Sequence, residues 1–176
     1  MLTKENRFKV IGIFFKNPTK EFHIREIAGM TGLSPAGALK ILNAHEKNKL
    51  LIKEERKATT NYRANVESDE FIQLKKIFNL YSIYSSGLLK KLIEFYNTPE
   101  AMILFGSYAR AEDMENGDVD IAIVTEKRGY PDLKKFEREL DRKVSLHLLA
   151  DVKKSEREFV NSLANGIVLF GYLKVV

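Results

Sequence analysis

Two short stretches decide how the second half of this chain folds: Phe105-Gly-Ser-Tyr-Ala-Arg-Ala-Glu112 and Gly117-Asp-Val-Asp-Ile-Ala-Ile-Val124. The first stretch follows an apolar run, so it predicts a buried strand that ends in Gly-Ser and opens a helix. Such a turn points backbone N–H groups and a hydroxyl at one spot, which suits an anion. In the second stretch, the alternation of a strand puts Asp118 and Asp120 on one face and the apolar side chains on the core face.

Two neighbouring carboxylates repel each other unless a positive charge lies between them. Mg²⁺ prefers oxygen ligands and is commonly held by one or two carboxylates together with substrate phosphates. We therefore expect Asp118 and Asp120 to bind magnesium beside an anion held by the Gly-Ser turn, as phosphoryl or nucleotidyl transfer requires. The alternative is that Gly106 only ends a strand and that Asp118 is a turn residue after Gly117.

These residues resemble the signature of the nucleotidyltransferase superfamily that includes DNA polymerase β, and most closely its minimal members. The resemblance covers about residues 88–176 and implies a small mixed β-sheet flanked by helices. It implies a Mg²⁺-dependent nucleotidyltransferase with one or two metal ions and a nucleoside triphosphate as substrate or ligand. The resemblance assigns catalysis and metal binding to Asp118 and Asp120, and nucleotide binding to Gly106, Ser107 and Arg110.

The chain departs from the family pattern in one place. The family usually supplies a third carboxylate from the neighbouring strand, and the corresponding stretch here is Arg142-Lys-Val-Ser-Leu-His-Leu148. Alternation leaves Ser145 or His147 where that acid is expected. The third acid commonly acts as a general base, which serine cannot do, and imidazole is a poor Mg²⁺ ligand. Whether the domain transfers a nucleotide therefore stays open, and so do the nucleotide and the acceptor.

The first 66 residues predict three helices and a β-hairpin. The helices are expected at residues 5–16, from Phe22 to Gly29 or Gly32, and at 35–47, and the short strands at 50–52 and 62–64. This order is the layout of a winged helix-turn-helix, and residues 22–42 resemble the helix-turn-helix of bacterial and archaeal winged-helix regulators. Residues 67–87 are expected to form a helical connector to the nucleotidyltransferase-like domain at 88–176.

Charge is spread unevenly along the chain. Residues 1–66 contain 13 Lys and Arg against 6 Asp and Glu, whereas the remainder is slightly acidic. A basic winged helix is expected to bind double-stranded DNA through phosphate and base contacts. The predicted DNA-binding residues are Lys40, Asn43, Lys47, Arg56, Lys57 and Arg63. The alternatives are that these are solvated surface positions, or that the winged helix binds a protein.

Composition narrows the remaining possibilities. The absence of cysteine excludes disulfides, thiolate zinc sites, iron–sulfur ligation and a cysteine nucleophile. No apolar run approaches the length that spans a bilayer, so a cytoplasmic location without membrane contact is expected. The sequence thus predicts an α+β DNA-binding regulator that binds magnesium and a nucleotide, with a protein partner or a homodimer as further possibilities. The alternative is an inactive transcriptional regulator that keeps the nucleotidyltransferase fold as a ligand sensor or protein-contact platform.

Overall fold

The computed structural model describes residues 3–56 and 59–174. The chain divides into two compact units, residues 1–78 and 79–176, and each is described by itself. The division falls inside one helix, α4 (Asp69–Ser86), and therefore inside the segment expected to be a connector. No helix among the described residues combines the length and the apolar character needed to cross a bilayer.

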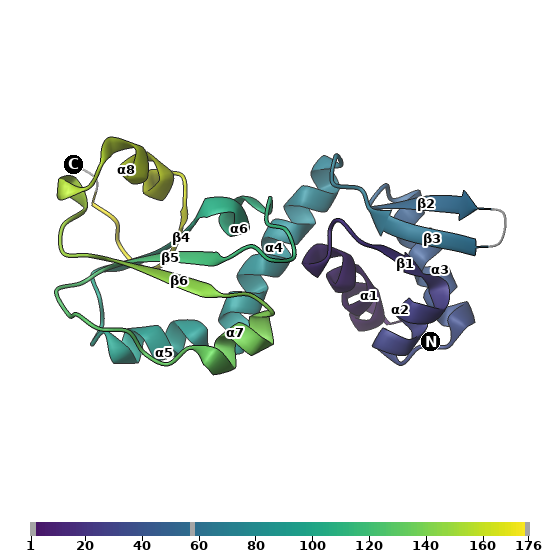
Figure 1. The fold of residues 1–176 in the computed structure, drawn as a ribbon, viewed down its shortest axis with the longest axis horizontal. Helices are drawn as coiled ribbons and strands as arrows, with labels where there is room; N and C mark the ends of the chain where they lie inside the picture. The colour runs from purple at the N-terminus through teal and green to yellow at the C-terminus, as the bar shows by residue number, and fades with distance from the viewer. Residues whose placement is uncertain (1–2, 57–58, 175–176) are drawn as a thin grey trace. The chain divides into compact units, whose positions relative to one another are not determined.

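The first unit contains three helices, the start of α4 and a small antiparallel sheet (Figure 1). The helices are α1 (Lys4–Lys16), α2 (Ile24–Thr31) and α3 (Pro35–Lys47), and the strands are β1 (Glu21–His23), β2 (Leu51–Arg56) and β3 (Thr59–Ala64), in the order β1-β3-β2. The start of α3 follows its sequence signal, because Ser34 Oγ accepts a hydrogen bond from Gly37 N and Pro35 occupies the first turn. The three predicted helices and the hairpin are thus present.

Strand β1 was not predicted. The sequence suggests that a helix starts at Phe22, but residues 21–23 pair with β3 and the helix starts at Ile24. His23 caps this helix by accepting from Arg25 N, and Glu26 accepts from His23 N. The hairpin strands are also longer than expected, because polar residues pair across them.

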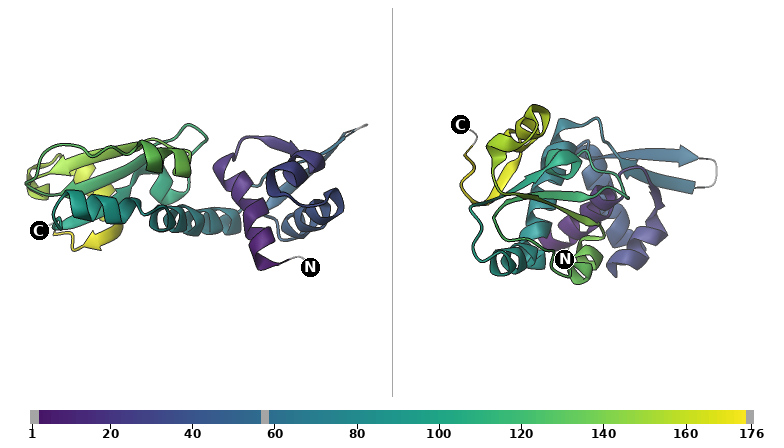
Figure 2. Two further views of the ribbon diagram at one scale, coloured as in Figure 1. Left: turned by 90° about the horizontal axis from the view of Figure 1, so that it is seen from below. Right: turned by 60° about the vertical axis from the view of Figure 1, so that its left-hand side comes forward.

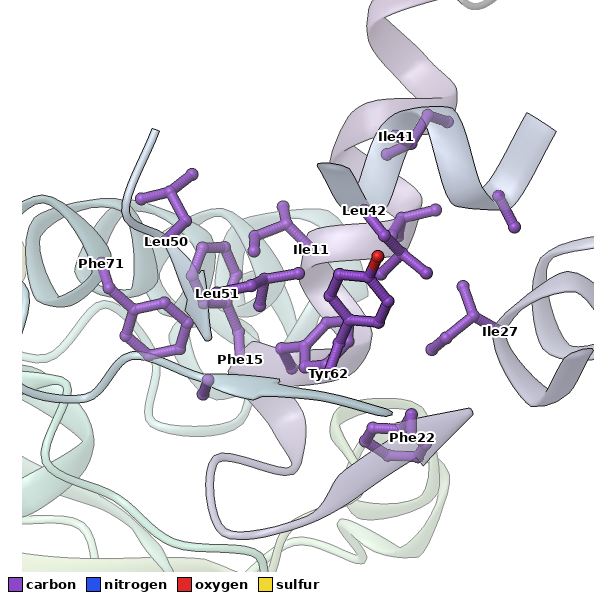
Figure 3. Close-up of a cluster of buried hydrophobic side chains, with 14 of the residues drawn as sticks. Ile11, Phe15, Phe22, Ile27, Ile41, Leu42, Leu50, Leu51, Tyr62 and Phe71 are labelled. Carbon is purple, nitrogen blue, oxygen red and sulfur yellow. The ribbon is translucent and has the colours of Figure 1, made fainter. Parts of the chain in front are cut away.

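The core of the first unit is built from side chains of all its elements. Figure 3 shows Ile11, Phe15, Leu42, Leu51 and Tyr62 gathered in this core, from α1, α3, β2 and β3. Tyr62 is fully buried as a residue, and its hydroxyl donates to Asn43 Oδ1 at 2.7 Å. Burial raises the pKa of Tyr62, so the phenol stays protonated and holds the hairpin against α3.

The second unit is a four-stranded mixed sheet covered by helices (Figures 1 and 2). Its strands are β4 (Ala101–Phe105), β5 (Val119–Val124), β6 (Val144–Leu149) and β7 (Ile167–Gly171), in the order β6-β5-β4-β7, with only β5 and β6 parallel. Its helices are the end of α4, α5 (Leu88–Phe95), α6 (Gly106–Arg110), α7 (Lys134–Leu140), a short 3₁₀ turn (Val152–Lys154) and α8 (Arg157–Ala164). The predicted α+β class with a small mixed sheet is confirmed.

Helices cover the two faces of this sheet differently. Figures 1 and 2 show α5 and α7 on one face and α8 on the other. Val119, Ile121 and Ile123 are completely buried with residues of α5 and α7. On the opposite face, Ala122 and Val124 pack with Leu163 of α8. The sheet face covered by α8 is therefore apolar toward the end of β5. The polar side chains at the start of β5 lie outside this apolar contact with α8.

Candidate functional site

The Gly-Ser turn and the acidic strand meet in the second unit. Strand β4 ends at Phe105, which pairs with Asp120 of β5, and Gly106 follows with a φ of +75°. A Cβ atom added to Gly106 would lie 2.6 Å from Asp120 Oδ2. The backbone of the turn is therefore in direct contact with one of the two carboxylates, and only glycine leaves room for that approach without strain.

Both aspartates lie on the same face as Ser145 and His147. The parallel register pairs Asp120 with Ser145 and Ala122 with His147 across β5 and β6. Ser145 Oγ donates to Asp118 Oδ2 at 3.1 Å, and His147 Nε2 lies 3.3 Å from Asp120 Oδ1. Each predicted carboxylate thus has a hydrogen-bonding partner on β6.

His147 is held in place by aromatic rings as well as by Asp120. Its imidazole lies 5.0 Å from the ring of Phe105 and 5.9 Å from that of Phe159, measured between ring centroids. Its side chain is 40% exposed and that of Asp120 is 28% exposed. The pair lies at the border between solvent and the apolar packing under α8, so water reaches both groups.

The donor set agrees with a hard divalent cation that is shared with a ligand. Asp118, directly before β5, and Asp120 within it offer carboxylate oxygens toward Ser145 and His147 of β6, and oxygen is the ligand atom that Mg²⁺ prefers. Among residues 3–56 and 59–174, no group of three His, Cys, Asp or Glu side chains forms a complete metal cage. These residues therefore fit a magnesium ion held by two carboxylates and completed by phosphate oxygens or water, not a closed structural site.

The other predicted nucleotide contacts lie on α6. Ser107 is half-buried next to Gly106, at the start of this short helix. Arg110 is exposed, and its Nε donates to Glu112 Oε2 at 2.8 Å. An exposed ion pair of this kind is weak, so the Arg110 guanidinium can exchange Glu112 for a phosphate at little cost.

Two cavities border residues of this site. One, of about 230 Å³, lies between α6 and α8, and the other, of about 910 Å³, begins at Asp118 and runs along α7. The smaller cavity is lined by Phe105, Gly106, Ala109, Arg110, Asn161, Ser162 and Asn165. Sequence reasoning missed the three residues at the end of α8, because no local pattern relates them to a turn more than 50 positions earlier.

A buried polar network supports the loop between α6 and β5. Asp113 and Arg142 are 2% and 7% exposed, and Arg142 Nη2 lies 3.4 Å from Asp113 Oδ2. Asn79 Nδ2 donates to Asp113 Oδ1 at 2.9 Å and to Tyr108 O at 3.0 Å. Burial raises the pKa of Tyr108 well above its usual value. This network fixes the loop that leads to Asp118 against the start of β6.

The residues predicted to contact DNA differ in how free they are. Lys40 and Lys47 are exposed on α3, and neither side chain has a hydrogen bond or ion pair to any described residue. Asn43 is exposed, but its Oδ1 accepts the hydroxyl of Tyr62. Its amide N–H groups remain available to a ligand, so α3 presents one amide donor between two free cations.

The hairpin cations are paired with carboxylates. Arg56 Nη2 lies 2.9 Å from Glu21 Oε1 and 3.2 Å from Glu54 Oε2, and Arg63 Nε lies 2.7 Å from Glu54 Oε1. These two guanidinium groups hold the pKa of Glu54 below its ordinary value. Lys57 lies outside the described residues. In the described part of the hairpin, fewer unpaired cations are therefore available to a ligand than the sequence suggests.

Comparison with known proteins identifies the second unit more closely than the first. Residues 88–172 match the family model described as "Polymerase beta, Nucleotidyltransferase". A solved structure of TrmBL2, described as an archaeal chromatin protein with a novel mode of DNA binding, aligns with 89% of this chain and 68% of its own chain. That alignment has 13% sequence identity and a TM-score of 0.33, which is too low to establish a shared fold. No curated protein sequence matches the chain. Residues 88–172 therefore form a nucleotidyltransferase-fold domain.

Proposed function

We propose that this protein is a DNA-binding regulator whose second unit binds a nucleoside triphosphate together with magnesium. The observation that carries the proposal is the contact between the Gly-Ser turn and the acidic strand, with the Cβ position of Gly106 only 2.6 Å from Asp120 Oδ2. An anion alone would bind poorly where this turn touches a carboxylate, because the Asp120 carboxylate would repel it. The site suits a polyphosphate that arrives with a cation.

Each residue of the proposed site has one task. Asp118 and Asp120 would hold the magnesium ion, and Ser107 with the backbone of Gly106 would hold phosphate oxygens. Ser145 and His147 orient the two carboxylates through their hydrogen bonds. When bound, magnesium neutralises phosphate charge and polarises the phosphoryl group. Arg110 would leave Glu112 and contact a phosphate of the nucleotide.

Nucleotide binding is a better-supported function than nucleotide transfer. The side chains at the position of the third acid are a serine, which cannot serve as a base, and a histidine already directed at Asp120. Transfer would require an acceptor hydroxyl to attack the α-phosphorus, with release of pyrophosphate and loss of the hydroxyl proton. We keep transfer as the second candidate because the two carboxylates and the Gly-Ser turn that it needs are present.

The proposal for the first unit is DNA binding through α3. A helix after a tight turn, followed by a hairpin, is the arrangement of winged helix-turn-helix proteins, whose recognition helix enters the major groove. Lys40 and Lys47 are free to meet phosphates, and the small residues Ala36 and Gly37 at the start of α3 allow a close approach. The Asn43 amide, which keeps its donors, is suited to a base edge.

The nucleotide half is tested by calorimetric titration of the full chain with ATP, GTP, CTP and UTP, with Mg²⁺ and with EDTA. At least one nucleotide is expected to bind only when Mg²⁺ is present. Asp118→Asn and Asp120→Asn should each abolish this binding, whereas Glu139→Gln, which removes an exposed carboxylate of α7, should not. Unchanged affinity in both aspartate variants would show that the site is misplaced.

Transfer and DNA binding need separate measurements. Release of pyrophosphate from a bound nucleotide, with duplex DNA, glycerol or a serine-containing peptide as acceptor, would establish transfer. Retained binding without release supports the role of a sensor. For the first unit, affinity for duplex DNA should fall steeply as salt is added. Protein binding releases counterions from the DNA, and a higher salt concentration opposes that release. Absent or salt-insensitive binding would refute the DNA-binding half of the proposal.

A further inference from the structure

The cavity between α6 and α8 differs in charge from the one beside Asp118. Of the residues lining the smaller cavity, Arg110 alone is charged. The larger cavity is lined mainly by charged side chains, among them Lys134, Glu137, Arg138 and Lys143. An uncharged, hydrogen-bonding group would therefore lose less solvation in the smaller cavity, where it meets amides and apolar surface instead of ions.

The size of the smaller cavity limits what can enter it. Its volume of about 230 Å³ lies below the roughly 300 Å³ at which pockets for whole drug-sized ligands begin. A complete nucleoside triphosphate does not fit, but one end of it does. Because Gly106 belongs both to the lining and to the proposed phosphate site, a nucleotide with its phosphates at Gly106 and Ser107 can reach into this space with its other end.

The polar edge of α8 offers amide groups to this space. Ser162 Oγ donates to Glu158 O, and Asn165 Nδ2 donates to Asn161 O, so these side chains are partly satisfied within the helix. The Asn161 amide makes no hydrogen bond to any residue that the structure describes, and it is exposed at the cavity. The Asn161 side chain thus offers a hydrogen-bond acceptor, Oδ1, beside a hydrogen-bond donor, Nδ2. The Oδ1 of Asn165 is also available as an acceptor.

We propose that α8 selects the base of the bound nucleotide, and that the Asn161 amide makes adenine the preferred base. This inference rests on the proposed nucleotide site and adds its specificity. Adenine presents an amino donor beside a ring-nitrogen acceptor, which is the pattern that an asparagine amide pairs with in a bidentate manner. Phe105 and Ala109 supply apolar surface for the ring, and Asn165 Oδ1 is a second acceptor.

The test compares Mg²⁺-dependent affinities for ATP, GTP, CTP, UTP and inorganic tripolyphosphate in the full chain. ATP should bind most tightly, and Asn161→Ala should weaken ATP binding by roughly fivefold to 150-fold, the worth of one bidentate base contact. The same variant should leave tripolyphosphate binding unchanged, because the phosphate site is intact. Gln73→Ala, which removes an exposed amide from α4, is the matched control and should change neither affinity.

The outcomes separate the two proposals. If the four nucleotides bind equally well, or if Asn161→Ala weakens tripolyphosphate as much as ATP, the base-selection proposal is wrong while the nucleotide site stands. Tighter binding of another base, with loss of that preference in Asn161→Ala, would keep the role of α8 and refute adenine. If neither tripolyphosphate nor any nucleotide binds with Mg²⁺, the proposed function fails and base selection fails with it.

Discussion

Replacing Gly106 by alanine tests the proposed site most directly. The change adds a Cβ atom at a residue with a φ of +75°, and that atom would lie 2.6 Å from Asp120 Oδ2. The left-handed backbone alone costs about 1–2 kcal/mol for a residue with a side chain. In addition, the Asp120 carboxylate must move, because real Cβ atoms are not found so close to an oxygen. Gly106→Ala should therefore lose both stability and ligand affinity.

A second glycine separates these two effects. Gly87 has a φ of +77°, close to that of Gly106, but a Cβ atom there would meet no atom within 4 Å beyond its chain neighbours. Gly87→Ala should carry the same backbone cost and leave Asp120 undisturbed. For a chain of this size, each kcal/mol lowers the midpoint of thermal unfolding by about 2–4 °C. Gly87→Ala should therefore show a decrease set by the backbone cost in a calorimetric melting scan, and Gly106→Ala should show at least as large a decrease.

Only Gly106→Ala should weaken the binding of nucleotide and magnesium. If Asp120 holds magnesium as proposed, displacing its carboxylate should cost about 10- to 100-fold in affinity, as the loss of supporting contacts does at metal sites. Isothermal titration of both variants at the same temperature makes the comparison. Equal affinity in Gly106→Ala and the wild type would refute the convergence of turn and carboxylate on one ligand. An equal loss in Gly87→Ala would refute its local origin.

Three further outcomes follow from the structure. Burial holds the pKa of His45 below its ordinary value of 6.5, so the neutral imidazole stabilises the fold above that pH, and this contribution is lost as the pH falls through the lowered pKa. The free energy of unfolding, measured by chemical denaturation between pH 7 and pH 5, should therefore decline. His45→Gln should make that decline smaller. Asp113→Ala should lower the free energy of unfolding by about 3–5 kcal/mol in urea titrations, because the Arg142 guanidinium stays buried without that carboxylate. A smaller loss would show that water reaches the Asp113–Arg142 pair. Lys40→Ala and Lys47→Ala should each reduce the slope of log DNA affinity against log salt by about 1, and unchanged slopes would exclude phosphate contacts from α3.

The features that the sequence predicts well depend on local periodicity. Alternation along a strand is enough to put Asp118 and Asp120 on one face, and to put Ser145 and His147 beside them once the parallel pairing exists. The turn from strand into helix at Gly106 follows from an apolar run that ends in Gly-Ser. These features need few long-range contacts, so short stretches of residues are sufficient to predict them.

Long-range pairing explains what the sequence could not predict. Strand β1 has three residues and no apolar alternation, and it exists because β3, 40 positions later, pairs with it. The same register brings Glu21 to Arg56 and Asn61, which reduces the free charge of a segment that looks strongly basic by composition. The cavity under α8 has the same cause, because Asn161 and Gly106 meet only through tertiary packing.

The parallel register of β5 and β6 also bears on how this chain could change over generations. Because Ser145 already lies opposite Asp120 and within hydrogen-bonding distance of Asp118, an aspartate at position 145 would put a third carboxylate beside the other two without moving any backbone. A deletion of one residue in β6 would instead turn that strand over and bring leucines to the acids. The scaffold is thus one residue substitution away from a third carboxylate at this edge of the sheet, although no serine codon becomes an aspartate codon by a single base change.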